Sequence, residues 1–267
     1  MTICLRGGIM YSTNTAKQGD FDMEQKYGLQ LYSVRDAMEA DFEDALKKVA
    51  EMGYTYVEFA GFFGRSAEEV KALLDKYGLI ISGTHTSWEQ LKPEVIEETV
   101  KYHTTIGNPH FIIPSANLST LEKIAEVVEV VNFAKPILEK AGIKLSFHNH
   151  SREFEVKPWG STSHTELEKQ TDMGFEIDTF WAWNAGTDPL QVMERLKDRI
   201  CVIHLKDGFK GGKGIPLGEG EAPVAAVRKK AIEMGLTMVV ESESLTPSGL
   251  DEAQRCITYL RSLDAQD

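Results

Sequence analysis

Eight short apolar runs alternate with segments of helical periodicity along almost the whole chain. The runs are rich in β-branched and aromatic residues and are bounded by glycine or polar residues, which is typical of strands. Several of the segments between them begin at Asp, Ser or Thr and end at Gly, as helices do. The strand-like runs span residues 27–34, 56–61, 79–87, 110–115, 144–150, 174–180, 200–207 and 237–244.

This alternation predicts a parallel sheet covered by helices, because parallel strands need crossover connections. The runs show no long polar alternation, as expected when both faces of the sheet are buried. Eight strand–helix units in 267 residues fit one (β/α)₈ TIM barrel, which needs roughly 250 residues. We therefore predict a single catalytic barrel domain over residues 26–267, and we expect residues 1–25 to form a loose leader outside it.

Composition narrows the class of protein. A 42% hydrophobic content with 26% charged residues is ordinary for a globular protein, and no apolar run approaches the ~20 residues that span a bilayer. The formal net charge of -12 would repel a phosphate backbone, so we expect neither nucleic acid nor membrane as a partner. Three widely separated cysteines without CxxC spacing favour reduced thiols and a cytoplasmic location.

Four successive strand-like runs each carry a metal-ligand side chain near their carboxyl ends. These are His148 in KLSFHNH, Asp178 in GFEIDTF, His204 in ICVIHLKD and Glu241 in TMVVESES. One such residue alone is more often a hydrogen-bonded core residue, but the carboxyl ends of barrel strands meet at one mouth, where reactive groups sit. We therefore predict one bound divalent ion, and two imidazoles with two carboxylates favour Mn²⁺, Co²⁺, Fe²⁺ or Zn²⁺ over Mg²⁺.

Other side chains near the strand ends are candidates for binding a substrate. Glu58 and His85 lie in runs that should be buried, where an unpaired charge is costly. Lys206 lies two residues beyond His204 and therefore on the same face, although a solvent-facing loop lysine is the alternative. Trp181 follows the sixth run and would form a wall for a sugar ring, with helix packing as the alternative.

A glycine-rich segment, GFKGGKGIPLGEGEAP (208–223), follows the seventh run. It lacks the GxxxxGK[ST] pattern of P-loops and the strand–GxGxxG–helix context of dinucleotide-binding folds, so it does not indicate a nucleotide site. We expect a mobile loop that closes over the barrel mouth.

At these positions the sequence resembles the xylose-isomerase-like TIM-barrel superfamily, which gathers sugar isomerases, ketose 3-epimerases, inosose dehydratases and endonuclease IV. The resemblance covers nearly all of residues 27–263. The usual metal ligands of that superfamily are Glu, Asp, His and Glu on strands five to eight. Asp178, His204 and Glu241 match the last three.

The fifth run departs from the superfamily pattern. His148 stands where the epimerases have Glu, and FHNH followed by Glu153 resembles a subgroup usually labelled sugar phosphate isomerase/epimerase, close to the YHHH of inosose dehydratases. In the epimerases both metal-binding Glu residues also serve as the opposed acid and base. The resemblance therefore implies Glu241 as general base with His150 or Glu153 as its partner, and the polar residues of strands two and three are the alternatives.

The predicted site supports chemistry next to a carbonyl. A divalent ion that chelates a carbonyl and an adjacent hydroxyl stabilises the enediolate formed when a base removes the α-proton. Return of the proton gives a metal-dependent sugar isomerase or epimerase, which is the function we predict. Loss of a β-substituent gives the alternative, a keto-sugar or keto-inositol lyase or dehydratase, including 3-keto-glycoside cleavage; a non-catalytic metal-binding barrel is the second alternative. The expected partner is a small carbohydrate, and the sequence is compatible with a homo-oligomer.

Overall fold

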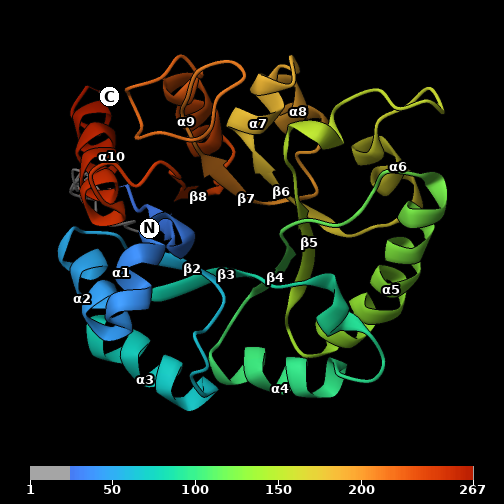
Figure 1. The fold of residues 1–267 in the computed structure, drawn as a ribbon, viewed down its shortest axis with the longest axis horizontal. Coiled ribbons are helices and arrows are strands. Elements are labelled where there is room, and N and C mark those ends of the chain that lie inside the picture. The colour runs from blue at the N-terminus through green and yellow to red at the C-terminus, as the bar shows by residue number, and fades with distance from the viewer. Residues whose placement is uncertain (1–24, 267) are drawn as a thin grey trace, which may run out of the picture.

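The computed structural model describes residues 25–266, which form a closed parallel barrel inside a ring of helices (Figure 1). Each strand pairs with its sequence neighbours, and the eighth closes on the first. The strands are β1 Gly28–Gln30, β2 Tyr56–Ala60, β3 Ile80–His85, β4 His110–Ile113, β5 Lys144–His148, β6 Gly174–Asp178, β7 Ile200–Leu205 and β8 Thr237–Val240. The predicted (β/α)₈ barrel is confirmed. The predicted leader lies outside the described residues except for Gln25.

The outer helices follow the predicted order. They are α2 Phe42–Glu51, α3 Ala67–Tyr77, α4 Ile96–Thr105, α5 Leu121–Lys140, α6 Ser163–Gln170, α8 Pro189–Arg195, α9 Val224–Glu233 and α10 Gly249–Asp264. The connections also contain α1 Arg35–Ala40, α7 Thr179–Asn184 and three 3₁₀ helices, η1 Leu31–Val34, η2 Trp88–Leu91 and η3 Ser151–Glu153. Among residues 25–266, no helix is both long and apolar enough to cross a bilayer.

Local sequence explains where helices begin and end, as α3 illustrates. The Ser66 side chain accepts a hydrogen bond from the Glu69 amide, and the Glu69 carboxylate accepts one from the Ser66 amide. This reciprocal pair satisfies two amides that have no partner within the helix. Gly78 ends the helix at φ 66°, a conformation that glycine adopts without strain.

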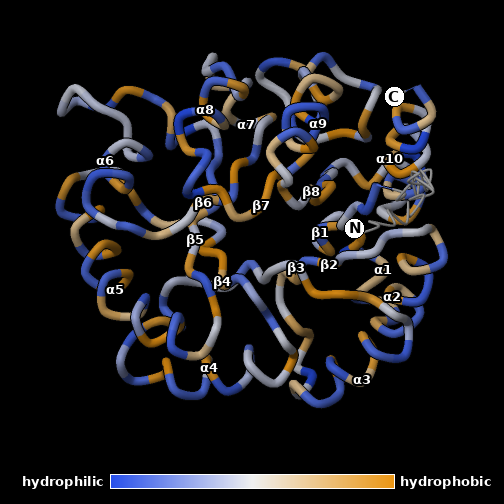
Figure 2. Tube along the Cα trace, turned by 180° about the vertical axis from the view of Figure 1, so that it is seen from behind, coloured by the Kyte–Doolittle hydropathy of each residue, from blue (hydrophilic) through white to orange (hydrophobic). Residues whose placement is uncertain are grey.

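Alternation along the strands separates an apolar shell from a polar interior. The ring of Phe59 lies 6.2 Å from that of Phe42 on α2, and the ring of Phe175 lies 4.6 Å from that of His164 on α6. Successive strand residues point to opposite faces, so Glu58, next to Phe59, points into the barrel. Hydrophobic residues concentrate in the strands and on the sides of helices that face them (Figure 2).

The first strand is shorter than its pattern predicts. A strand is expected over 27–34, but β1 ends at Gln30 and the following residues form η1. The Gln30 side chain accepts a hydrogen bond from the Tyr32 amide at 3.0 Å and donates one to Glu58 at 2.6 Å. This buried side chain therefore stabilises the turn at the end of β1 while it remains inside the barrel.

The glycine-rich segment after β7 is held by one carboxylate. Asp207 Oδ1 accepts from the amides of Gly208 (2.8 Å) and Ala222 (3.0 Å), and Oδ2 accepts from those of Gly218 (2.9 Å) and Gly220 (3.1 Å). A Cβ at Gly220 would lie 2.3 Å from Asp207 Oδ1, which explains glycine there. The segment expected to be mobile is thus attached to the barrel at both of its ends.

Replacement of Asp207 by Asn should loosen this segment. The NH₂ half of the asparagine side chain cannot accept hydrogen bonds, so two of the four backbone amides lose their partner, at a cost of about 1–3 kcal/mol. Hydrogen–deuterium exchange in residues 208–222 should accelerate, while Asp198→Asn at an exposed position should leave it unchanged. Equal protection in the two variants would show that Asp207 does not hold the segment.

Candidate metal centre at the barrel mouth

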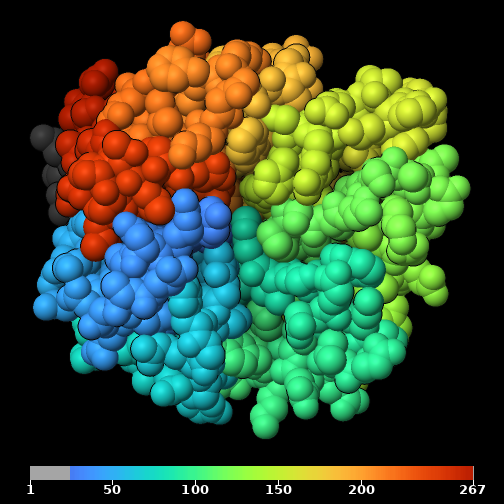
Figure 3. Space-filling view, viewed as in Figure 1, coloured from blue at the N-terminus to red at the C-terminus, as the bar shows by residue number. Residues whose placement is uncertain are grey.

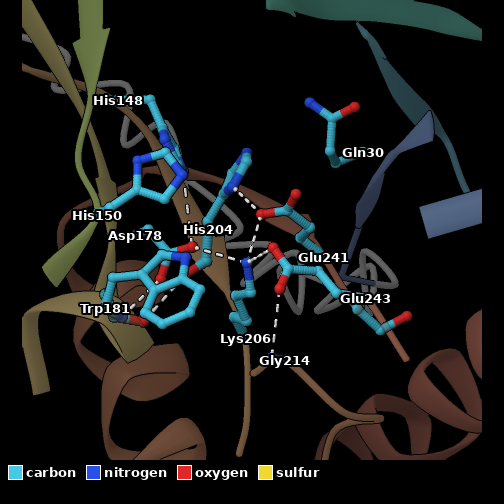
Figure 4. Close-up of polar contacts among 12 residues, drawn as sticks. Gln30, His148, His150, Asp178, Trp181, His204, Lys206, Gly214, Glu241 and Glu243 are labelled. Carbon is cyan, nitrogen blue, oxygen red and sulfur yellow. Dashed lines mark hydrogen bonds and ion pairs between the residues drawn. The ribbon is translucent and has the colours of Figure 1, made fainter. Parts of the chain in front are cut away.

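Four ligand-type side chains from β5 to β8 converge at the mouth (Figure 4). One ligand atom from each of His148, Asp178, His204 and Glu241 lies within 4.8 Å of the others, and all four residues are buried. His204 Nδ1 is 3.2 Å from Glu241 Oε2, and His148 Nε2 is 3.6 Å from Asp178 Oδ2. The structure therefore brings together the residues that the sequence analysis selected as metal ligands, and we call them the mouth cluster.

Backbone contacts fix the positions of the mouth cluster. Asp178 pairs with His204 in the register of β6 and β7. The side chain of buried Asn149 donates to the Asp178 carbonyl at 3.0 Å and accepts from the Asp178 amide at 3.1 Å, which joins the ends of β5 and β6. Asp178 Oδ1 accepts from the Trp181 amide at 2.9 Å and caps α7. Asp178 Oδ2 has no hydrogen-bond partner, so this oxygen is available to bind a metal ion in the mouth cluster.

A fully buried lysine lies against the mouth cluster. Lys206 Nζ is 2.6 Å from Glu243 Oε1, 3.0 Å from Glu241 Oε2 and 3.5 Å from Asp178 Oδ2. Burial alone would lower the pKa of Lys206, but the carboxylates of Glu241, Asp178 and Glu243 outweigh burial and raise it. The ammonium also lies 4.8 Å from the Trp181 ring centroid. Lys206 therefore supplies positive charge inside the site instead of pointing to solvent.

A second polar layer lies below the mouth cluster. Gln30 donates to Glu58 Oε1 at 2.6 Å, and His85 Nε2 is 2.6 Å from Glu176 Oε2. His204 Nε2 is 2.9 Å from Glu58 Oε1 and 3.2 Å from Glu176 Oε1, so its imidazole belongs to both layers. Carboxylates only accept, and His204 Nδ1 lies 3.2 Å from Glu241 Oε2, so both nitrogens carry a proton in the metal-free protein. The inner carboxylates hold the proton on Nε2, and Nδ1 faces the mouth and is the nitrogen that would lose its proton to a metal ion.

Burial and charge shift the inner carboxylates in opposite directions. Burial, followed by repulsion from Glu176, raises the pKa of Glu58 to about 7. Burial opposes ionisation of Glu176 as well, but His204 and His85 outweigh it and lower the pKa of that carboxyl well below its usual range. Both carboxylates contact His85 and His204, so they compete for the positive charge of the same two imidazoles. Glu176 is therefore the ionised member that holds His204 and His85.

The residues predicted as partners of the base lie beside the cluster. The imidazole of His150 lies 4.9 Å from that of His148 and 5.9 Å from the Trp181 ring, and its buried Nδ1 has no partner. Glu153 is buried, and its two oxygens accept from the His150 amide and from Arg152 Nε, each at 2.8 Å. Nδ1 of His150 is therefore available to contact a ligand, whereas the carboxylate of Glu153 is already hydrogen-bonded within its own loop.

Glu176, Glu243 and Asn149 belong to the site but are not among the residues predicted from the sequence. Glu176 precedes Asp178 by two positions and Glu243 follows Glu241 by two, so period-two spacing along a strand was the signal that pointed to both. Asn149 lies within the FHNH motif, but its contact with Asp178 depends on two strands that are adjacent only in the fold. Glu176 and Asn149 contact residues of the mouth cluster, and Glu243 contacts Lys206, which lies against it.

Comparison with known proteins agrees with this architecture. The family model of the xylose isomerase-like TIM barrel matches residues 46–263. The chain belongs to this family. A solved structure of a sugar phosphate isomerase/epimerase from Parabacteroides distasonis superposes with a TM-score of 0.76 at 25% identity, covering 95% of this chain and 98% of that one.

Curated relatives carry the names of two different enzymes. A 2-oxo-tetronate isomerase from Haemophilus influenzae is 25% identical over 248 residues, which are 81% of this chain and 94% of the relative. An inosose dehydratase from Geobacillus kaustophilus is 23% identical over 189 residues, 62% of this chain and only 61% of the relative. The relatives of this family member thus include isomerases, epimerases and dehydratases, and they agree on the family without fixing one reaction.

Replacement of Lys206 by Met should destabilise the metal-free protein. Glu241 and Asp178 would remain buried without the ammonium, and breaking a buried ion pair typically costs about 3–5 kcal/mol. Urea unfolding in the presence of a chelator measures this loss, with Lys101→Met at an exposed position of α4 as the matched control. If the two variants unfold at the same urea concentration, Lys206 does not neutralise the site.

Proposed function

We propose that this family member is a divalent-metal-dependent enzyme that removes the proton next to a carbonyl group of a small carbohydrate. One observation carries the proposal. Two buried ligand atoms of the mouth cluster, His148 Nε2 and Asp178 Oδ2, have no hydrogen-bond partner, although unsatisfied buried polar atoms are costly. A cation between them would satisfy both atoms.

The donor set fits a divalent transition metal. His148, Asp178, His204 and Glu241 would hold the ion, and two imidazole nitrogens favour Mn²⁺, Co²⁺, Fe²⁺ or Zn²⁺ over Mg²⁺. A divalent ion bound there supplies Lewis-acid polarisation of the carbonyl and hydroxyl oxygens of a sugar. Lys206 keeps a partner in either state, because Glu243 Oε1 lies 2.6 Å away outside the ligand set.

We assign the proton transfer to residues on opposite sides of the mouth. Glu241 directly follows β8 and is the general base, while His150 follows β5 and presents its unpartnered Nδ1 as the second group. Lys206 stabilises negative charge that develops on the substrate oxygens, and the Trp181 ring lies beside it as an apolar wall. Glu153 holds the loop that carries His150 and remains the alternative partner.

The inner layer has a positioning role in this proposal. Glu58 is enclosed below His204, so we assign it to the orientation of that imidazole together with Glu176, although the sequence pattern suggested substrate binding. Carboxylates behind a ligating histidine fix its tautomer and strengthen its basicity. His85 is the exception, because 9% of its side chain is exposed and it remains a candidate for contact with substrate.

Isomerisation or epimerisation is the outcome that we propose first. The isomerase relative, which aligns over 94% of its length, supports this choice. Loss of a β-substituent from a keto-sugar or keto-inositol is the alternative, and it is supported by His148 in place of a second carboxylate and by the dehydratase relative.

We also propose a cytoplasmic location without nucleic-acid partners, since Cys201 and Cys256 are free thiols and the net charge is -12.

Solvent isotope incorporation tests the proposed reaction. Purified protein loaded with Mn²⁺ is incubated in D₂O with ketoses, 3-keto-glycosides and keto-inositols, and the recovered compounds are examined by NMR and mass spectrometry. Deuterium next to the carbonyl of recovered substrate is expected, and the product distinguishes an isomerase or epimerase from a lyase. A protein that binds metal but catalyses no exchange across the panel would support the non-catalytic alternative.

Replacement of Asp178 by Asn should abolish retention of the metal. Asn retains an oxygen that caps α7, but it lacks the second carboxylate oxygen that faces the cluster. Metal content after dialysis should fall from one ion per chain to near zero. Asp188→Asn removes the same charge at the cap of α8, outside the cluster, and should retain the ion. Full metal content in Asp178→Asn would remove this residue from the ligand set.

Replacement of Glu241 by Gln should lower turnover by a factor of about 10²–10⁴, the usual contribution of a positioned base. His150→Ala should lower turnover with unchanged metal content, because His150 lies outside the ligand set. Steady-state kinetics combined with metal analysis separates the two effects, with Glu97→Gln on exposed α4 as the control. Wild-type turnover in His150→Ala would show that His150 is not the partner of the general base, and Glu153 or His85 would then be the candidate.

A further inference from the structure

We infer that a cavity beside the mouth cluster binds a second, neutral, hydroxyl-rich unit of the substrate, such as a second sugar attached to the one that reacts. This inference rests on the proposed function and narrows its substrate class to glycosides and oligosaccharides. The cavity has a volume of about 580 Å³, within the range of sites for small molecules.

Loops at the same end of the barrel as the mouth cluster form this cavity. They follow β3, β4 and β5, whereas most ligands of the cluster are on β6, β7 and β8. Figure 3 shows a depression near the middle of this face, where segments from distant parts of the chain meet. The residues that carry the argument are Ser87, Trp88, Ser115, Asn117, Ser119 and Arg152.

The cavity adjoins two residues of the proposed site. His148 Nδ1 lies 3.3 Å from the carbonyl oxygen of Pro114, and the next residue, Ser115, lines the cavity. Glu153 also lines it and accepts a hydrogen bond from the His150 amide. A molecule that reacts at the cluster and fills this cavity must therefore extend past His148 and His150, away from β8.

The lining recognises hydroxyl groups better than anions. Arg152 and Lys157 contribute positive charge, but Glu153 and Glu89 contribute an equal negative charge. Arg152 Nε donates to Glu153 at 2.8 Å, which neutralises that pair. Net charge of the lining is therefore close to zero, which gives a phosphate or carboxylate little attraction.

Polar and aromatic groups on the lining complement a sugar. The hydroxyls of Ser87, Ser115 and Ser119 donate and accept, as sugar hydroxyls do. The indole of Trp88 supplies an apolar surface, and Lys92 Nζ lies 4.9 Å from its ring centroid. A few polar groups beside an aromatic ring are typical of small-molecule sites.

Calorimetric titration of the full chain tests this inference with glucose, cellobiose, maltose and glucose 6-phosphate as probes. At least one disaccharide should bind about tenfold more tightly than glucose, a difference of about 1.4 kcal/mol. Ser119→Trp should fill the cavity and remove that preference while glucose binding stays unchanged. Glu129→Trp, which adds the same ring at an exposed position of α5 outside the cavity, should retain the preference.

Three results would overturn the inference: disaccharides no tighter than glucose, a preference that survives Ser119→Trp, or glucose 6-phosphate as the tightest ligand. The disaccharide preference is a ratio of two affinities and should appear in the metal-free as well as in the Mn²⁺-loaded protein, because the cavity residues are outside the predicted ligand set. Loss of metal binding or of deuterium exchange would therefore contradict the proposed function alone. Loss of the disaccharide preference would contradict the cavity assignment alone.

Discussion

Both polar layers of the barrel depend on the contacts that the buried imidazole of His204 makes with their carboxylates. Its Nε2 meets Glu58 and Glu176 below, and its Nδ1 meets Glu241 at the mouth. A charge inside a low-dielectric core is costly unless it is paired, so each of these groups requires the others. The inner carboxylates therefore do not form a separate site; they set which nitrogen of His204 is presented to a metal ion.

Barrel geometry explains why much of the site could be predicted. Once eight strand–helix units are recognised, the carboxyl ends of β5 to β8 must meet, and His148, Asp178, His204 and Glu241 come together without any knowledge of loops. The fold and the mouth cluster thus follow from periodicity and strand order.

Features that depend on several roles for one side chain could not be predicted in the same way. Helix α7 starts directly after β6 because Asp178 caps it with one oxygen while the other faces the cluster. Gln30 shortens β1 through a side-chain contact with the Tyr32 amide. The cavity combines loops that are far apart in sequence, and balanced charges such as Arg152 with Glu153 leave no charge pattern to find. Asp178 and Gln30 each combine a local hydrogen bond with a tertiary contact, to the mouth cluster and to Glu58, and the cavity depends on loops that only the fold brings together.

The most direct test of the account is a crystal of the protein soaked in Mn²⁺ and measured by anomalous diffraction. One anomalous peak is predicted between His148 Nε2, Asp178 Oδ2, His204 Nδ1 and the Glu241 carboxylate, with Lys206 remaining close to Glu243. A peak among Glu58, His85 and Glu176, or no peak at saturating Mn²⁺, would contradict the assignment of the mouth cluster as the metal centre.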